Sequence, residues 1–196
     1  MLVFWDQRLV FLATPKTGST AIAMALESLA AVSVQRPPLL KHTNIQRFHR
    51  FLGPYLKAAS GEDFTTVALM REPVDWLGSW YRFRQREDLP DERASTRGMG
   101  FDAFARAYCE DPQPLFAEVG SQARFLSPEG RPGVDRIFCY ERIETFVEFL
   151  EDQLGCEIHL PRVNVSPLAD LDLRPDTLKR LRKAMARDVA LYDSLR

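Results

Sequence analysis

The sequence predicts an α/β fold, with a central, mainly parallel β-sheet flanked by helices in a single domain that spans residues 1–196. Short, continuous apolar runs such as Leu9–Ala13 and Thr65–Met70 are typical of strands buried on both faces. Segments with helical apolar periodicity follow these runs, most clearly at Ile143–Leu154. Buried strands that alternate with helices favour a parallel sheet covered by helices.

The chain is predicted to open with two short strands, Leu2–Trp5 and Leu9–Ala13, because a polar turn separates two apolar runs. A helix is expected at Ala21–Ala30, where apolar residues recur at helical spacing. A brief strand at Val32–Val34 ends before two consecutive prolines, which interrupt regular structure. Asn44 to about Ala59 is then predicted to form a helix, because a good capping residue begins it.

Later elements are assigned on similar grounds. Pro73 suits the first turn of a helix and Gly155 suits the position just after one. The polar, glycine-containing stretch Asp88–Gly100 is expected to be a loop, and Pro161–Asp172 is expected to be irregular. The assigned elements are strands at Thr65–Met70 and Arg136–Tyr140, and helices at Val74 to about Arg86, Phe101–Tyr108, Ser121–Phe125, Ile143–Leu154 and Arg174–Leu195.

Composition is that of an ordinary globular protein, with 45% hydrophobic and 27% charged residues. The net charge of −1 indicates no global attraction to nucleic acid or to an anionic membrane surface. No apolar stretch reaches the length of a membrane span. Cys109, Cys139 and Cys156 are odd in number and lack metal-ligand spacing, which favours reduced thiols and a cytoplasmic location.

A candidate anion-binding loop lies between the strand at Leu9–Ala13 and the next helix. A helix N-terminus and the loop N–H groups attract negative charge, and Lys16 adds a full positive charge. Gly18 allows a ligand to approach the backbone closely. The loop differs from the ATP/GTP phosphate loop, in which two glycines precede the lysine. The residues that could contact an anion are Pro15, Lys16, Thr17, Gly18, Ser19 and Thr20.

A second candidate phosphate-binding site follows the strand at Thr65–Met70. Arg71 stands at the carboxyl end of this strand, where open α/β sheets bind ligands. Ser79 lies about two turns into the next helix, so a planar guanidinium and a hydroxyl could hold one phosphate. The alternative is a surface ion pair of Arg71 with Glu72 or Asp75.

These motifs resemble those of the sulfotransferases that use 3'-phosphoadenosine-5'-phosphosulfate (PAPS). Pro-Lys-Thr-Gly-Ser-Thr at 15–20 is similar to their 5'-phosphosulfate loop, and Arg71 with Ser79 is similar to their 3'-phosphate motif. Residues 137–143, which include Tyr140-Glu141, resemble a family strand whose tyrosine lies near the adenine; a core tyrosine is the alternative. The resemblance covers residue 9 to about 166. It implies a P-loop-NTPase-like sulfotransferase fold, with PAPS as co-substrate and no metal requirement.

The chain also departs from the family pattern. It contains no Arg-Lys-Gly segment near its C-terminus like the one that cytosolic relatives use on the 3'-phosphate. Arg162, Asn164 and Ser166 occupy roughly that place, without an assigned role. Golgi relatives carry a membrane anchor, and no such segment is evident here. Because the Arg-Lys-Gly segment is missing, the chain resembles the carbohydrate branch of the family, to which the Golgi members belong, more closely than the cytosolic small-molecule branch. It differs from the Golgi members in showing no anchor segment.

Sulfuryl transfer needs charge stabilisation and a base for the acceptor hydroxyl. Lys16 is placed to stabilise the leaving phosphate. His42 is the preferred base, because Lys-His in this irregular segment resembles the base position of family members. A structural role is expected for His49 and a surface position for His159, and a carboxylate base is the alternative to His42.

The acceptor is expected to carry a hydroxyl or an amine, as carbohydrates and many small molecules do. Its site is expected beside His42 and the loops Asp88–Gly100 and Val119–Arg124, where polar and basic side chains gather.

Two other functions are possible for this architecture. A nucleotide or small-molecule kinase would need an ATP-type loop and a carboxylate for magnesium. A non-catalytic adenine-nucleotide-binding module would need no intact catalytic residues. The basic and polar candidates in or near the loops Asp88–Gly100 and Val119–Arg124 are Arg84, Arg86, Arg93, Gln122 and Arg124.

Overall fold

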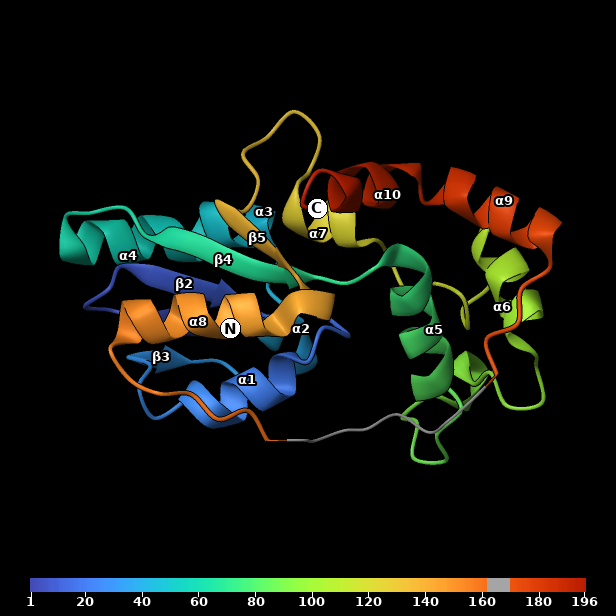
Figure 1. Cartoon of the computed structure of the whole chain (residues 1–196), viewed down its shortest axis with the longest axis horizontal. Helices are drawn as coiled ribbons and strands as arrows, with labels where there is room; N and C mark the ends of the chain where they lie inside the picture. Colours follow the sequence, from blue (N-terminus) through green and yellow to red (C-terminus); the bar gives the residue numbers. More distant parts are fainter. Residues whose placement is uncertain (162–169) are drawn as a thin grey trace. The chain divides into compact units, whose positions relative to one another are not determined.

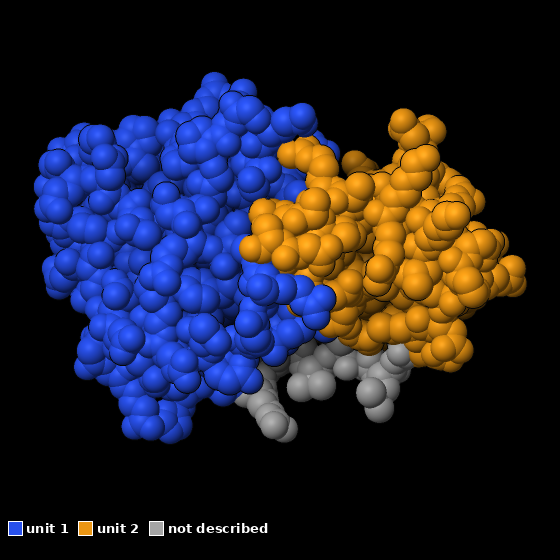
Figure 2. Space-filling view, turned by 45° about the horizontal axis from the view of Figure 1, so that its top comes forward, with its two compact units in different colours: residues 1–71, 122–164, 195–196 blue, residues 72–121, 165–194 orange. Residues whose placement is uncertain are grey.

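The computed structural model describes residues 1–161 and 170–196, which form two compact units (Figure 2). Unit 1 takes in the described residues of Met1–Arg71, Gln122–Asn164 and Leu195–Arg196. Unit 2 takes in those of Glu72–Ser121 and Val165–Ser194. Assignment of the whole chain to a single domain stays a prediction.

Unit 1 contains a five-stranded mixed sheet in the order β3-β1-β2-β4-β5. The three strands β2, β4 and β5 are parallel, whereas β1 pairs antiparallel with both β2 and β3. The α/β class is thus confirmed, and the parallel arrangement holds for one half of the sheet. A tight turn after Phe4 forces the antiparallel pairing of β1 with β2, because parallel strands need a long crossover. The strands are β1 (Leu2–Phe4), β2 (Leu9–Leu12), β3 (Val32–Ser33), β4 (Thr65–Met70) and β5 (Arg136–Cys139).

Two helices cover one face of this sheet (Figure 1): α1 (Ser19–Leu26) and α8 (Ile143–Leu154). Alternate strand residues such as Phe11 and Leu69 meet Ile22 of α1 and Phe146 of α8 in one buried core. The intervening residues, among them Leu12 and Met70, are equally buried and face the other way. The other helices in the described part of unit 1 are α2 (Pro38–Lys41), α3 (Ile45–Arg47), a π-helix (Phe48–Leu52), α4 (Gly53–Ser60), α7 (Gln122–Leu126) and a 3-10 turn at Tyr140–Arg142.

Unit 2 is helical, and its core is rich in aromatic side chains. Trp76 and Tyr81 are buried in this core, where they pack with Phe101, Phe104 and Leu181. The helices are α5 (Pro73–Phe83), α6 (Phe101–Tyr108), α9 (Pro175–Ala184) and α10 (Ala186–Asp193), with a 3-10 turn at Glu92–Ala94.

The structure corrects three expectations about the elements. The predicted terminal helix Arg174–Leu195 is divided at Met185, whose φ of −96° and ψ of 21° interrupt the helical geometry. The short helix α2 was not expected, and Pro38 begins it. The predicted helix at 44–59 contains a π-helical turn at Phe48–Leu52. Across the described parts of the chain, no helix combines the length and apolarity that crossing a membrane requires.

Candidate functional site

Three strand ends of unit 1 bring the predicted nucleotide residues to one edge of the sheet. β2, β4 and β5 run parallel, and the register pairs Leu12 with Ala68 and Met70 with Cys139. The carboxyl ends of these strands therefore lie side by side. The segments that follow them begin at Ala13, Arg71 and Tyr140.

The loop after β2 has the backbone geometry of an anion cradle. Gly18 is the N-cap of α1 in the left-handed region, with φ of 71°, and Lys16 also has a positive φ of 67°. The first N–H groups of a helix have no acceptor within the helix, so α1 presents donors at this loop. Thr17 is fully buried, and its Oγ1 donates to the carbonyl oxygen of Thr14 at 3.0 Å. This buried hydrogen bond therefore stabilises the conformation of the loop.

Arg71 joins the two predicted phosphate motifs. One of its guanidinium nitrogens donates to the carbonyl oxygen of Lys16 at 3.3 Å. The guanidinium carbon lies 4.8 Å from the centre of the Tyr140 ring, in cation–π geometry. A Cβ atom added at Gly18 would lie 3.1 Å from Cε2 of Tyr140. Lys16, Gly18, Arg71 and Tyr140 thus form one contiguous group, hereafter the Arg71 cluster.

His42 follows helix α2 and is half-buried. Its Nδ1 lies 2.6 Å from the carbonyl oxygen of Ala13, the residue after β2. A carbonyl oxygen only accepts hydrogen bonds, so Nδ1 carries the proton in the neutral ring and Nε2 has the lone pair. Burial lowers the pKa of His42 below 6.5, and the positive charge of Lys41 lowers it further, against the raising effect of the Ala13 carbonyl.

Lys41 connects the His42 segment to the loop. Its Nζ donates to Oγ1 of Thr20 at 2.9 Å, and partial burial lowers its pKa. Thr20 lies in the first turn of α1, so a third positive charge adjoins the cradle. Sequence reasoning gave Lys41 no role of its own. Its position directly before His42, the predicted base, is the sequence feature that could have indicated a place at the site.

Several other predicted residues are placed differently or remain untested. Ser79 is 4% exposed in α5 and belongs to unit 2, so its part in a phosphate grip stays a prediction. His159 is exposed, as expected, and His49 is exposed on the π-helix. Arg162, Asn164 and Ser166 lie outside the residues that the structure describes.

The residues expected at an acceptor site have other partners. Arg84 donates to the carbonyl oxygens of Leu115 and Glu118. Arg86 and Arg93 form ion pairs with Asp88 and Asp91, respectively. Gln122 is 1% exposed, so its predicted place on an acceptor surface is wrong. It is buried because its side-chain amide bonds to the main chain of Arg71.

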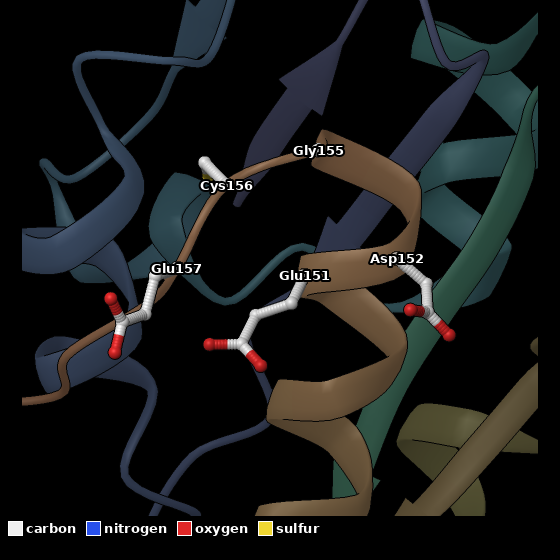
Figure 3. A pocket seen from close by; sticks show the side chains of 5 residues that line it. All are labelled: Glu151, Asp152, Gly155, Cys156 and Glu157. Carbon is white, nitrogen blue, oxygen red and sulfur yellow. The ribbon is translucent and has the colours of Figure 1, made fainter.

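The hollow shown in Figure 3 is not an anion site. It has a volume of about 330 Å³ and is lined by Glu151, Asp152, Gly155, Cys156 and Glu157. Helix α8 runs back along the sheet after β5, so its C-terminal end lies away from the carboxyl edge of the strands. Three carboxylates would repel a nucleotide phosphate. A second hollow, of about 750 Å³, is lined by Glu27 and residues 33–36, and it also lacks the residues of the Arg71 cluster.

Cys109, Cys139 and Cys156 are all free thiols. Within residues 1–161 and 170–196, no three His, Cys, Asp or Glu side chains are grouped so as to hold a metal ion. Comparison of the chain with protein-family models and with curated proteins finds no match. A functional assignment therefore depends on the residues of the site and on the motif resemblance.

Proposed function

We propose that the protein is a PAPS-dependent sulfotransferase that transfers a sulfuryl group to a hydroxyl or amine acceptor, such as a carbohydrate. One observation carries the proposal: the Arg71 guanidinium donates to the Lys16 carbonyl oxygen across neighbouring strand ends. Two motifs that are 55 residues apart in the chain, each similar to a phosphate-binding motif of that family, are thereby adjacent. The sulfotransferase variant of the P-loop fold and the cytoplasmic location belong to the same proposal.

The chemistry of the Arg71 cluster fits a polyanionic adenine nucleotide. Lys16 and Arg71 supply positive charge, and the start of α1 supplies N–H donors. Gly18 has no Cβ atom, so the Tyr140 ring can lie close against the backbone of the loop. We assign Lys16, Gly18, Ser19 and Thr20 to the 5'-phosphosulfate, Arg71 with Ser79 to the 3'-phosphate, and Tyr140 to the adenine. Pro15 and Thr17 support the loop.

The chain's own residues can perform the transfer by positioning and electrostatics. PAPS supplies the sulfuryl group and leaves as 3'-phosphoadenosine-5'-phosphate. The Nε2 lone pair of His42 takes the proton of the acceptor hydroxyl, while the Ala13 carbonyl holds the ring through Nδ1. The ammonium of Lys16 stabilises the charge that grows on the leaving phosphate. This reaction requires no metal from the protein.

The test is thermal stabilisation by 3'-phosphoadenosine-5'-phosphate, compared with ADP and ATP in the absence of magnesium and with ATP in its presence. A ligand that binds only the folded state raises the apparent stability by mass action. Stabilisation by the 3'-phosphorylated nucleotide alone is expected, because Arg71 and Ser79 would have no 3'-phosphate to hold in ADP or ATP. Stabilisation by ATP only when magnesium is present would favour the kinase instead. Binding without sulfuryl transfer to any acceptor would favour the non-catalytic module.

A further inference from the structure

Gln122 is a buried side chain that bonds to both main-chain groups of Arg71. Its Oε1 accepts a hydrogen bond from the Arg71 N–H at 2.9 Å, and its Nε2 donates to the Arg71 carbonyl oxygen at 2.8 Å. Arg71 directly follows Met70, the last residue of β4 in the sheet register. Main-chain groups that leave a sheet still need partners when they are buried. One side chain supplies both partners here.

This pair of hydrogen bonds fixes the direction in which the Arg71 side chain leaves the backbone. The N–H belongs to the peptide group before the Arg71 Cα and the carbonyl belongs to the peptide group after it, so both backbone torsions of Arg71 are restrained. From this restrained backbone the side chain extends to the Tyr140 ring and to the Lys16 carbonyl oxygen. Gln122 is itself held firmly, because Ala123 and Leu126 of the same short helix, α7, are buried.

We infer that Gln122 is a positioning residue for the phosphate grip of Arg71, acting through the Arg71 main chain and not by touching the nucleotide. The inference deepens the proposed function and rests on it for the choice of nucleotide. It has a distinctive consequence. The Arg71→Ala variant keeps the main-chain atoms that Gln122 contacts, so the hydrogen bonds of Gln122 survive while the side chain that it positions is gone.

The experiment is a double-mutant cycle with wild type, Gln122→Met, Arg71→Ala and the double variant. Methionine keeps the length of glutamine without its amide. Affinity for 3'-phosphoadenosine-5'-phosphate is measured by calorimetry and stability by urea unfolding. Gln122→Met is expected to weaken binding about tenfold when Arg71 is present, and by less than about twofold in the Arg71→Ala background. Its effect on stability should be the same in both backgrounds.

Thr66→Val is the matched control. Thr66 is fully buried on the same strand, and its hydroxyl donates to Asp135 at 2.6 Å, so the variant loses stability through a buried hydrogen bond away from Arg71. Its affinity for the nucleotide should stay within about twofold of wild type. If Gln122→Met weakens binding equally with and without the Arg71 side chain, or leaves binding unchanged, the inference is wrong.

Failure of the proposed function gives a different result. Wild-type protein would then bind ADP or ATP in preference to the 3'-phosphorylated nucleotide. The same four proteins titrated with the preferred nucleotide would still show whether the effect of Gln122 depends on Arg71. A wild-type protein that binds none of the three nucleotides would overturn both the proposed function and the inference.

Discussion

Gly18 combines two constraints that a side chain would violate. Its φ of 71° lies in the left-handed region, and its missing Cβ leaves room for the Tyr140 ring. Gly61, the C-cap of α4, has a similar φ of 78° but would have nothing within 4 Å of an added Cβ. A side chain at Gly61 would therefore introduce backbone strain alone, whereas a side chain at Gly18 would introduce both backbone strain and a close contact with Tyr140.

Gly18→Ala and Gly61→Ala are each expected to lower the free energy of unfolding by about 1 kcal/mol, because alanine is strained in left-handed geometry. Only Gly18→Ala should also weaken the binding of 3'-phosphoadenosine-5'-phosphate, by displacing Tyr140. Urea unfolding and calorimetric titration of both variants check this. Equal nucleotide affinity in the two variants would show that Tyr140 and the loop are not coupled.

His42 should give the reaction a characteristic dependence on pH. Burial, and then Lys41, lower its pKa below 6.5, so the ring stays neutral and able to accept a proton at pH 7. Turnover should therefore be flat near neutrality and fall only at pH values below 6.5. Lys41→Met removes one cause of the lowered pKa and should move the acid limb toward higher pH. Rate profiles at saturating nucleotide measure both.

His42→Ala is the companion variant. It should reduce turnover severely, by roughly a hundredfold or more, because no other group is assigned to the acceptor proton. Nucleotide affinity should be nearly unchanged. A variant that loses binding but retains turnover of its bound fraction would refute the assignment of His42 as base.

At the scale of elements, helix α5 begins with an unusual cap. The Oε2 atom of Glu72 accepts a hydrogen bond from the N–H of Asp75 at 2.8 Å, and Pro73 occupies the first turn. Aspartate is a preferred capping residue and alanine is not. Glu72→Ala is expected to lower the free energy of unfolding by about 1 kcal/mol, whereas Glu72→Asp should retain most of the stability.

Urea unfolding measures these effects, with Glu62→Ala as the control. Glu62 is exposed and pairs with Arg8 at 3.4 Å, a type of interaction that contributes little. If Glu72→Ala and Glu62→Ala were equally stable, the cap would not matter to α5.

The elements that sequence predicted best are those with strong local signals. The bounds of β4, α6 and α8 agree with prediction, because apolar runs, helical periodicity and the Gly155 cap mark them. The break at Met185 carries no proline or glycine that would mark it in the sequence, and Met185 itself lies in the core of unit 2. Helix α2 is only four residues long, too short for periodicity to reveal.

The candidate site was predictable to the extent that its residues follow strands. Lys16, Arg71 and Tyr140 each follow a strand, and parallel pairing of those strands brings them together. Gln122 was assigned to the wrong environment because a polar residue near charged neighbours suggests an exposed loop. Its burial depends on contacts with Arg71, 51 positions away in the chain, which no local pattern encodes.

At the scale of the whole molecule, charge is distributed unevenly despite a net value of −1. In unit 1, the carboxyl edge of the parallel strands carries positive charge from Lys16, Lys41 and Arg71. The C-terminal end of α8 carries negative charge from Glu151, Asp152 and Glu157. A polyanionic ligand therefore meets attraction at one edge of unit 1 and repulsion at another. Local fields, rather than the total charge, decide where it binds.

The hydrogen bonds between Arg71 and Gln122 have a consequence for how the protein can diverge. Residues 72–121 leave unit 1 after Arg71 and rejoin it at Gln122, so this stretch begins and ends at neighbouring points. A segment with adjoining ends has the geometry of an insertion, which can be lengthened, shortened or exchanged without moving its anchors. The predicted acceptor loop 88–100 falls inside it. Apart from Ser79, the residues proposed to hold the nucleotide belong to unit 1, so the predicted acceptor loop can change within this stretch while Lys16, Gly18, Arg71 and Tyr140 stay as they are.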